Sequence, residues 1–433
     1  MTTVQLVRNP ADTRHGATDL VICPDVNFQI GRQQFTVSFG EPTSLELDLL
    51  ALASAVYGSD IAIKRGEREA FARTIEVFVP VVNYAVLEMV RPKIEVALYR
   101  LTGDNWTVRL LQVPGEVEVA EWYADGQDEV LLFSGGLDSL AGAYKRLTEG
   151  VSHLTLVSHV THNPAVLASQ EALFQQLQLT FGDRVSRKHF HVSGRDHPGF
   201  PFPADDEREE TQRSRSFLFL ILGALVARRL RAGKLLMMAE NGQMAIHLPL
   251  NQARTGGFST RTAHPDFLAR MQDILRSALR YEVTIVNPFL YMTKAEVISQ
   301  LVAERPDLIG LSGSCWRAAR VGSKHCGECV PCLIRRIALE RHGIVPSDYA
   351  RDLFSEQVPG LKEDDRGKRN LYDLVEFCRH FLDDALRASV VEDYPEIVSR
   401  HFDGARATDM YARFAHEAQG VLSRYAGTRD LLA

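Results

Sequence analysis

The stretch Glu129-Val-Leu-Leu-Phe-Ser-Gly-Gly-Leu-Asp-Ser139 decides how the central part of the chain is interpreted. A short apolar run, Val130 to Phe133, leads into Ser-Gly-Gly and then into a segment whose apolar spacing suits a helix. This order predicts a buried strand, a tight turn and a helix. Glycine lets backbone N–H groups approach a phosphate closely, and a helix N-terminus favours negative charge. The sequence therefore predicts a phosphate-binding loop.

The composition of this loop departs from the G-x-x-x-x-G-K-[ST] pattern, because it contains no lysine. The hydroxyls of Ser134 and Ser139 can donate to phosphate oxygens. Asp138 alone would repel a phosphate, so its presence indicates that Mg²⁺ accompanies the phosphates. The alternative is a turn whose glycines serve backbone geometry alone. Ser-Gly-Gly-x-Asp-Ser resembles the pyrophosphate loop of N-type ATP pyrophosphatases, which cleave ATP to AMP and pyrophosphate while activating a carbonyl or carboxylate.

The bulk composition is that of an ordinary globular protein of two or three domains, with 433 residues, 45% hydrophobic and 24% charged. A net charge of −6 argues against a broad nucleic-acid surface. The first ten residues lack an apolar signal segment, and the apolar stretch 217–227 is too short to span a bilayer. We expect a cytoplasmic protein without a membrane segment, and a buried core helix at 217–227.

Three regions are expected along the chain. Residues 1–125 predict a small α+β accessory domain: strands at 73–82, 93–101 and 107–113, a hairpin turn at 103–105, and a helix at 44–56 with Ser44 as its N-cap. Residues 126–340 alternate strands and helices, which predicts an α/β, doubly wound parallel sheet that binds its ligand beyond the carboxyl ends of the strands. Residues 341–433 predict a helical extension that packs over the sheet or forms a homodimer face.

Four of the six cysteines lie within eighteen residues, in the pattern Cys-x10-Cys-x2-Cys-x2-Cys. Four thiolates at this spacing suit a closed, structural Zn²⁺ site. Lys324, Arg335 and Arg336 can offset its negative charge, and His325 is redundant once four sulfurs are present. An iron–sulfur cluster and unliganded cysteines are the alternatives. The proposed ligands are Cys315, Cys326, Cys329 and Cys332.

Taken together, the loop and the cysteines resemble the 7-cyano-7-deazaguanine synthase (QueC) family, and the similarity extends over roughly residues 128–340. Departures include His264 in place of a tyrosine, and an unusual segment at 254–261. QueC-like proteins with additional domains also occur in bacterial antiphage systems of the Qat and type IV CBASS classes, and the N-terminal region makes this chain look most like the Qat member. The segments that carry the resemblance between loop and cysteines are Arg213-Ser-Arg215, Glu240-Asn241-Gly242, Ala263-His-Pro-Asp-Phe267, Asn287-Pro-Phe-Leu290, Thr293-Lys-Ala-Glu296 and Ser314-Cys-Trp316.

The resemblance implies ATP, Mg²⁺ and Zn²⁺ as cofactors and 7-carboxy-7-deazaguanine as substrate, activated as an acyl-adenylate that an amine then attacks. It implies that Asp138, Ser139, Lys294 and Arg213 are catalytic, and that Asp266 and Glu240 contact the base. Lys294 and the two arginines would neutralise charge on the leaving pyrophosphate. Plainer roles remain open: ion pairs at a helix end for the arginines, a helix N-cap for Asp266, surface charge for Lys294 and a strand end for Glu240. The nucleotide-binding set that it implies is Ser134, Gly135, Gly136, Leu137, Asp138, Ser139, Arg215 and Asn241.

Other functions stay open from the sequence. A biosynthetic QueC enzyme is one, and a non-catalytic nucleotide-binding scaffold in a defence complex is another. A tRNA-thiolating ATP pyrophosphatase would need a catalytic cysteine near the loop and a basic RNA face, and neither is evident. An amidotransferase is disfavoured because residue 2 is Thr rather than Cys. We expect residues 1–125 to bind a protein; if the acceptor is a protein, this region would bring its terminus to the acyl-adenylate.

Overall fold

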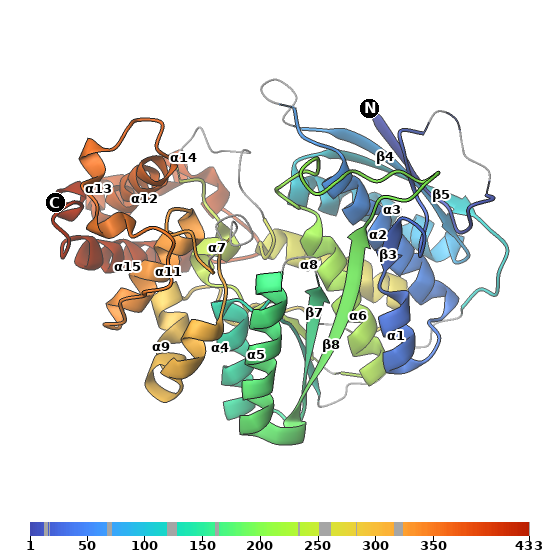
Figure 1. The fold of residues 1–433 in the computed structure, drawn as a ribbon, viewed down its shortest axis with the longest axis horizontal. Coiled ribbons are helices and arrows are strands. Elements are labelled where there is room, and N and C mark those ends of the chain that lie inside the picture. The colour runs from blue at the N-terminus through green and yellow to red at the C-terminus, as the bar shows by residue number, and fades with distance from the viewer. Residues whose placement is uncertain are drawn as a thin grey trace.

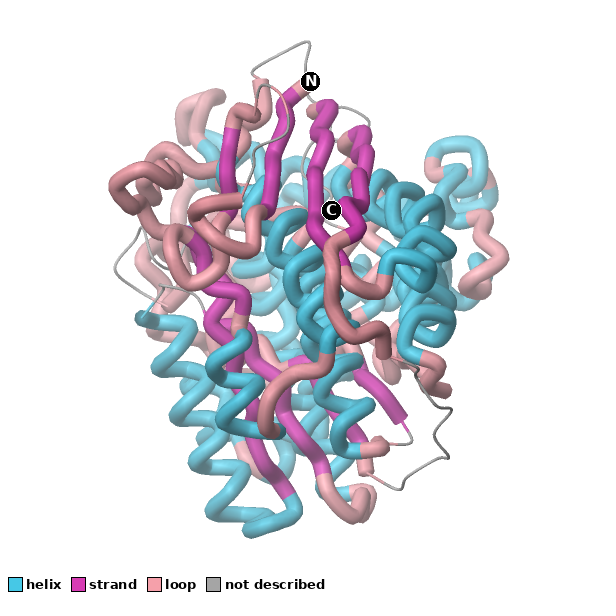
Figure 2. Tube along the Cα trace, turned by 90° about the vertical axis from the view of Figure 1, so that its right-hand side faces the viewer, coloured by secondary structure: helices cyan, strands magenta, loops and turns pink. Residues whose placement is uncertain are grey.

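The structure is a computed structural model of the 433-residue chain. Its elements are labelled in Figure 1, and Figure 2 shows the strands of the two sheets from the side. The side chains of 234–237 are outside the description, as are residues 13–15, 17, 67–71, 119–127, 161–163, 233, 251–260, 283, 316–323 and 433.

The central sheet has the order β3-β8-β7-β6-β9. Its four parallel strands are β6 (Glu129–Leu132), β7 (Leu154–Val160), β8 (Val185–Gly194) and β9 (Lys234–Met237). From β6 the chain moves outward through β7 and β8, and then returns to the opposite side of β6 with β9. Ligands of such sheets bind where the strand order reverses, beyond the carboxyl ends of the strands. The predicted α/β parallel sheet is confirmed, and the reversal lies between β6 and β9.

Helices cover both faces of this sheet because successive side chains of a strand point to opposite sides. Val130 and Leu132 pack in one apolar core with α6 (Arg215–Leu230). Leu131 and Phe133 pack in another with the helices of the second face. The expected buried helix at 217–227 is the centre of α6. The helices associated with the second face and its edge are α4 (Leu137–Thr148), α5 (Pro164–Phe181), α9 (Lys294–Glu304) and α11 (Val330–Arg341).

The N-terminal region forms a second sheet of order β2-β1-β4-β5, and all of its described pairings are parallel. Its strands are β1 (Thr2–Leu6), β2 (Leu20–Ile22), β4 (Thr74–Val81) and β5 (Asn105–Gln112), and they pack against α2 (Ser44–Ala62) and α3 (Tyr84–Thr102). Parallel strands joined by helices make this region α/β, so the predicted α+β arrangement is wrong.

Two local predictions in this region are also wrong. Residues 93–101 are helical, because Val90, Ile94, Ala97 and Leu101 recur at helical spacing and are buried together in α3. Residues 103–105 do not form a hairpin: Gly103, with φ 74°, ends α3, and β4 pairs with β5 in parallel. The helix predicted at 44–56 is present as α2, but its N-cap is Thr43, whose hydroxyl accepts a hydrogen bond from the Glu46 N–H.

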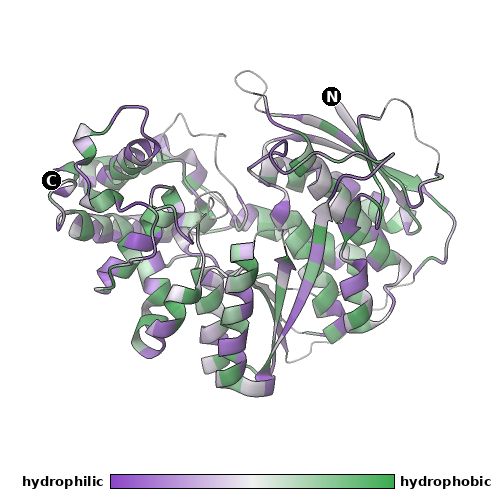
Figure 3. Cartoon of the chain, viewed as in Figure 1, coloured by the Kyte–Doolittle hydropathy of each residue, from purple (hydrophilic) through white to green (hydrophobic). Residues whose placement is uncertain are grey.

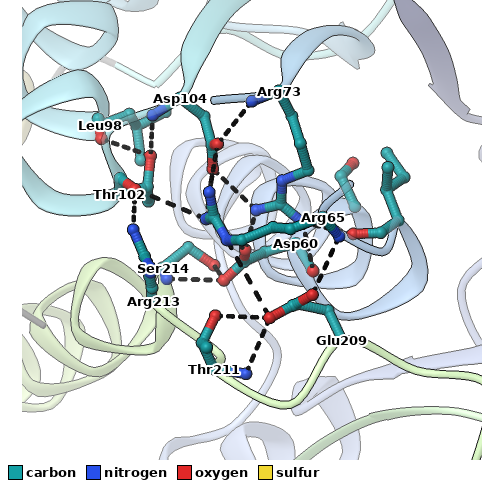
Figure 4. A network of polar contacts seen from close by, with 12 residues as sticks. Asp60, Arg65, Arg73, Leu98, Thr102, Asp104, Glu209, Thr211, Arg213 and Ser214 are labelled. Atoms are coloured by element: carbon teal, nitrogen blue, oxygen red, sulfur yellow. Dashed lines mark hydrogen bonds and ion pairs between the residues drawn. The ribbon is translucent and has the colours of Figure 1, made fainter. Parts of the chain in front are cut away.

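The N-terminal region is joined to the central sheet by strand pairing and by a common core. β3 (Phe28–Ile30) pairs antiparallel with β8, and α1 (Arg32–Phe39) follows it. Residues of α2, α3 and α6 share one apolar core. Figure 3 shows the green of hydrophobic residues along most of α6. Figure 4 shows an ion network in which Arg73 contacts both Asp60 and Asp104. The domain boundary near 125 stays a prediction, but the described part of 1–125 pairs with the central sheet and shares an apolar core with it.

The C-terminal region is helical, as predicted. Its longer helices, α12 (Arg366–Leu382) and α15 (Gly404–Leu422), are accompanied by α13 (Asp384–Ala388) and α14 (Val390–Asp393). Their apolar faces share a core with α11 and with α7 (Gly242–Ile246), so this region packs beside the segments that follow β9. α8 (Pro265–Leu279) packs on α3 and belongs to the N-terminal core. Among the described helices, none combines the length and hydropathy required to cross a bilayer.

Candidate active site

The predicted phosphate loop joins the end of β6 to the start of α4, with the strand, turn and helix in the expected order. Gly135 has φ 79°, a conformation that costs other residues free energy. A Cβ at this glycine would lie 2.9 Å from Cγ of Gln170 and 3.2 Å from its backbone nitrogen. Gly136 is the N-cap of α4, so the free N–H groups of the first helical turn face the region beyond the loop. Glycine at 135 is therefore required by both dihedral angle and space.

The loop hydroxyls gather at the N-terminus of α4. Oγ of Ser134 lies 3.3 Å from Oγ of Ser139 and accepts a hydrogen bond from the Gly136 N–H over 3.2 Å. The Ser139 hydroxyl donates to the Gly136 carbonyl over 2.9 Å. Leu137 has its side chain in the apolar core under the loop. Backbone N–H groups and hydroxyls at a helix N-terminus make an anion site, which suits a pyrophosphate.

Asp138 is the centre of a buried polar cluster. Its Oδ2 accepts hydrogen bonds from Nζ of Lys294 and from Nδ2 of Asn241, each over 2.8 Å. Side chains of both Lys294 and Asp138 are 7% exposed. Burial would raise the pKa of Asp138, but the Lys294 charge and the surrounding hydrogen bonds hold that pKa below its usual range. Asp138 is therefore ionised and paired at neutral pH.

Glu240 brings a second carboxyl group to Asp138. Burial and the neighbouring charge of Asp138 raise the pKa of Glu240 well above its usual range. Two carboxyl groups in contact cannot readily ionise together. Glu240 also accepts a hydrogen bond from Nδ2 of Asn241 over 3.1 Å. The two carboxyl groups can be accommodated together if one takes up a proton or if a divalent cation binds between them with the phosphates. The cluster therefore fits the Mg²⁺ expected from the sequence.

Two short segments hold these partners in place. Asn241 caps α7 through its Oδ1, which accepts from the Met244 N–H. Thr293 caps α9 in a reciprocal capping box with Glu296, which fixes the first turn that carries Lys294. The Lys294 N–H donates to Oε1 of Gln243 over 3.0 Å. The positions of Asn241 and Lys294 are therefore set by helix N-termini that contact each other.

The C-terminal helix α15 forms hydrogen bonds with the segments that carry Asn241 and Lys294. Oγ1 of Thr293 donates to Glu417 over 2.7 Å, and Nε of Arg413 donates to Glu296 over 2.7 Å. The Leu248 N–H donates to the hydroxyl of Tyr411 over 3.2 Å. From the sequence we expect only a packing role for this helix and no link to Lys294. The link was missed because these contacts span more than a hundred residues and carry no local sequence signal.

The two arginines near the start of α6 have different surroundings. Nη1 of Arg213 donates to the Thr102 carbonyl over 3.0 Å, and burial together with the charge of Arg65 lowers the pKa of Arg213 to about 10. Figure 4 shows Arg213 directed at the end of α3. The guanidinium of Arg215 instead lies 5.6 Å from the centre of the Phe219 ring, and that ring packs edge-on against His159 near the carboxyl end of β7. Burial and then the Arg215 charge lower the pKa of His159 to about 3. Arg215 therefore lies close to the end of β7 through Phe219, whereas Arg213 contacts the end of α3.

Asp266 lies at the start of α8, where the N-cap is His264 rather than Asp266 itself. Its Oδ1 lies 3.1 Å from both Nε of Arg270 and Nε2 of His401, and its Oδ2 lies 3.8 Å from Nε of Arg100. Burial would raise the pKa of Asp266, but the Arg270 hydrogen bond and these charges lower it. The carboxylate is ionised and contacts Arg100 of the N-terminal region and His401 of the C-terminal region. Its predicted role with the base remains untested.

The four predicted cysteines converge on one point. Their sulfur atoms all lie within 4.8 Å of one another. The Sγ atoms of Cys315 and Cys329 are 4.0 Å apart, and those of Cys326 and Cys332 are 3.9 Å apart. Tetrahedral Zn²⁺ with Zn–S bonds of about 2.3 Å requires sulfurs about 3.8 Å apart, so the set fits zinc. Gly327 makes the turn with φ 81°, and a Cβ there would lie 1.9 Å from the Arg351 carbonyl oxygen.

His325 is redundant as a ligand, as predicted, and has another use. Its Nε2 accepts from the Ser314 N–H over 3.3 Å, and its Nδ1 lies 3.0 Å from Oδ2 of Asp348. Lys324, Arg335 and Arg336, which the sequence suggested could offset the charge of the metal site, donate hydrogen bonds to other groups. Lys324 donates to the Gly310 carbonyl, Arg335 to Ser312 and Arg336 to Glu340. Trp316 and most of the segment 254–261, singled out in the sequence, lie outside the described residues.

Comparison with known proteins bears on the second half of this site. A family model described as "Queuosine biosynthesis protein QueC" matches residues 234–343, the segment that holds Glu240, Asn241, Lys294 and the four cysteines. The 7-cyano-7-deazaguanine synthase of Methanoregula boonei is 21% identical over 229 residues, which are 51% of this chain and 98% of that protein. The chain is a distant relative of the QueC family.

Two further relatives agree with this relationship. The 7-cyano-7-deazaguanine synthase 1 of Mesorhizobium japonicum is 26% identical over 230 residues, covering 51% of this chain and 92% of that protein. The 7-cyano-7-deazaguanine synthase of Pseudoalteromonas translucida is 23% identical over 233 residues, covering 52% of this chain and 99% of that protein. About half of this chain therefore lies outside the matches to QueC relatives, although nearly the whole of each relative is matched.

Proposed function

We propose that the protein uses ATP to adenylate the carboxylate of a 7-deazaguanine base, 7-carboxy-7-deazaguanine, and transfers the activated carbonyl to an amine. The observation that carries the proposal is the convergence of Lys294, Asn241 and Glu240 on Asp138. These three belong to the segment that matches the QueC family model, whereas Asp138 belongs to the separate phosphate loop. A site assembled from both motifs is what an ATP-dependent member of this family requires.

The reaction has two steps. A carboxylate oxygen of the base attacks the α-phosphorus of ATP, and pyrophosphate leaves with the electron pair of the broken P–O bond. An amine then attacks the acyl-adenylate, loses a proton and displaces AMP, which leaves an amide. With ammonia as the amine, a second ATP can dehydrate the amide to a nitrile.

This chain's residues would serve the first step by charge and orientation. The loop N–H groups and the hydroxyls of Ser134 and Ser139 would bind the departing pyrophosphate. Lys294 and Arg215 would add positive charge as that group leaves. Asp138, with Glu240, would hold Mg²⁺, which supplies further charge neutralisation when bound. The four-cysteine site would hold Zn²⁺ in a structural role, because all four positions are filled by sulfur.

The acceptor amine separates two forms of the proposal. The relatives are named as 7-cyano-7-deazaguanine synthases, and ammonia as acceptor would make this protein a biosynthetic enzyme like them. We favour a protein terminus as acceptor, within an antiphage defence system, because about half of the chain lies outside those matches. Residues 1–125 would bind that protein and raise the local concentration of its amine. In support, α3 exposes the apolar side chains Met89, Val96 and Tyr99.

The experiment incubates the enzyme with ATP, 7-carboxy-7-deazaguanine and the proteins encoded beside it, and then measures intact masses. A mass shift equal to an added deazaguanine amide supports conjugation. Deletion of residues 1–125 is unsuitable as a control, since it removes β3 and much of a shared core. Val96→Glu should instead weaken conjugation, while Val391→Glu, at a valine of α14 that is 51% exposed against 44% for Val96, should not. Free 7-cyano-7-deazaguanine as sole product, unaffected by Val96→Glu, would identify a biosynthetic enzyme.

A further inference from the structure

The phosphate loop is held by a short segment that runs between α9 and the cysteine site. The Gly313 N–H donates to the Gly135 carbonyl over 3.0 Å. In a trans peptide the C=O and the following N–H point in opposite directions. Fixing the Gly135 carbonyl on Gly313 therefore also fixes the direction of the Gly136 N–H, which donates to Oγ of Ser134 and so orients one of the loop hydroxyls. The contact is close, because a Cβ at Gly136 would lie 3.4 Å from the Gly313 carbonyl oxygen.

A buried arginine of α11 fixes the residues on both sides of Gly313. Nη1 of Arg335 donates to Oγ of Ser312 over 2.9 Å and to Oγ of Ser314 over 3.3 Å. Its Nη2 donates to the Ile309 carbonyl over 2.9 Å. Arg335 is 1% exposed, so these hydrogen bonds are shielded from water. A planar guanidinium with several donors can hold three acceptors at once, which a lysine ammonium on a flexible stem does less well.

The cysteine site sets the position of both ends of this arrangement. Cys315 follows Ser314 directly, and Cys332 lies one helical turn before Arg335 in α11. His325, adjacent to Cys326, accepts the Ser314 N–H. A metal that holds Cys315 against Cys332 therefore brings Arg335 and the segment 312–314 together.

We propose that Arg335 is a positioning residue that connects the four-cysteine site to the phosphate loop through Ser312, Gly313 and Ser314. It acts on bound nucleotide through Gly135 rather than by contact. The inference rests on the proposed function only in that the loop ligand is taken to be ATP. It gives the cysteine site a consequence for nucleotide affinity in addition to its contribution to folding.

The neighbouring Arg336 provides a matched control. It is also buried, at 3% exposed, and lies on the same helix. Its described polar partners are Glu340 of α11 itself and Asp352 and Tyr425 of the C-terminal region. Arg335→Lys and Arg336→Lys should therefore destabilise the protein by similar mechanisms, whereas only the first disturbs the segment that touches the loop.

The experiment compares the full-length wild type, Arg335→Lys and Arg336→Lys in three measurements. These are zinc content, the dissociation constant for α,β-methylene-ATP with Mg²⁺, and amide hydrogen exchange of the peptide covering 133–140. Arg335→Lys should retain zinc, weaken nucleotide binding about tenfold, equivalent to about 1.4 kcal/mol, and speed exchange in the loop peptide. Ser312→Ala combined with Ser314→Ala should reproduce these changes, and Arg336→Lys should leave both loop readouts at the wild-type level.

The outcomes separate the inference from the function on which it rests. If the wild type binds no nucleotide but Arg335→Lys still speeds exchange at 133–140, the proposed function fails and the positioning role stands. If the two lysine variants exchange and bind alike, the positioning role is wrong whatever the wild type binds. If Arg335→Lys loses zinc, the variant that combines Ser312→Ala with Ser314→Ala decides the question. Amide hydrogen exchange at 133–140 equal to that of the wild type in this variant would overturn the inference.

Discussion

Replacing Lys294 with methionine should destabilise the protein by about 3–5 kcal/mol at neutral pH, because it leaves a buried carboxylate without its cation. Nζ of Lys294 lies 2.8 Å from Oδ2 of Asp138, and each side chain is 7% exposed. Two unit charges 4 Å apart attract by about 4 kcal/mol at an effective dielectric constant of 20, which is of the same size. Methionine retains the unbranched, flexible shape of the side chain, so the loss reports mainly on charge.

A double-mutant cycle isolates the pair. Asp138→Asn alone leaves the ammonium buried without a counter-charge, whereas Asp138→Asn with Lys294→Met removes both charges. We expect the double variant to lose about 1–3 kcal/mol less than the sum of the two single losses. Urea unfolding of all four proteins, followed by circular dichroism at pH 7.5, measures the free energies. Additive losses within about 0.5 kcal/mol would refute a coupled buried pair.

The pH dependence of the same variants gives a second check. Lys294 depresses the pKa of Asp138 in the folded state, so its stabilising effect is present above the ordinary carboxyl pKa and is lost as the pH falls. In Lys294→Met the carboxyl can take up a proton at higher pH than in the wild type. The stability difference between the two proteins should therefore narrow as the pH is lowered from 7 toward 4.

Three further predictions concern the surroundings of the site. Burial raises the pKa of Glu417 to about 7, so ionisation of this carboxyl group destabilises the fold as the pH rises from the pKa of the unfolded chain through 7. Glu417→Gln should therefore raise the melting temperature at pH 8 and leave it unchanged near pH 5. Gly135→Ala and Gly150→Ala should each cost about 1–2 kcal/mol for a positive φ, but only Gly135→Ala, whose Cβ meets Gln170, should raise the KM for ATP. Elemental analysis should find one zinc per chain, and Cys326→Ser should lose the metal and much of the protein's thermal stability; iron with sulfide, or metal-free native protein, would contradict this.

Most of the central fold could be predicted from local patterns in the sequence. The loop, α4 and the cysteine cluster could be predicted because each depends on neighbours within about twenty residues. The segment 93–101 was misinterpreted because Ile94 and Leu98, four residues apart, satisfy both an alternating and a helical pattern. Helical spacing applies in the structure, since Val96 between them is 44% exposed.

Long-range geometry was the harder part of the site. Lys294 and Glu240 could be chosen from their motifs, but their approach to Asp138 depends on β9 returning beside β6. The sequence groups Arg213 with Arg215 because the two lie two residues apart at the start of one helix. The two have different partners: Arg213 donates to the Thr102 carbonyl of the N-terminal region, whereas Arg215 lies over the Phe219 ring. The Glu417 contact could not be predicted, because no pattern around that residue indicates a distant partner.

The central claim is that the loop and its buried partners turn over ATP with a deazaguanine carboxylate. The most direct measurement is the release of AMP and pyrophosphate from ATP and Mg²⁺, with and without 7-carboxy-7-deazaguanine, by the wild type and by Asp138→Ala. We expect equimolar AMP and pyrophosphate that depend on the base and disappear in Asp138→Ala, with the fold intact by circular dichroism. Wild-type turnover in Asp138→Ala, or no base-dependent AMP from the wild type, would contradict it.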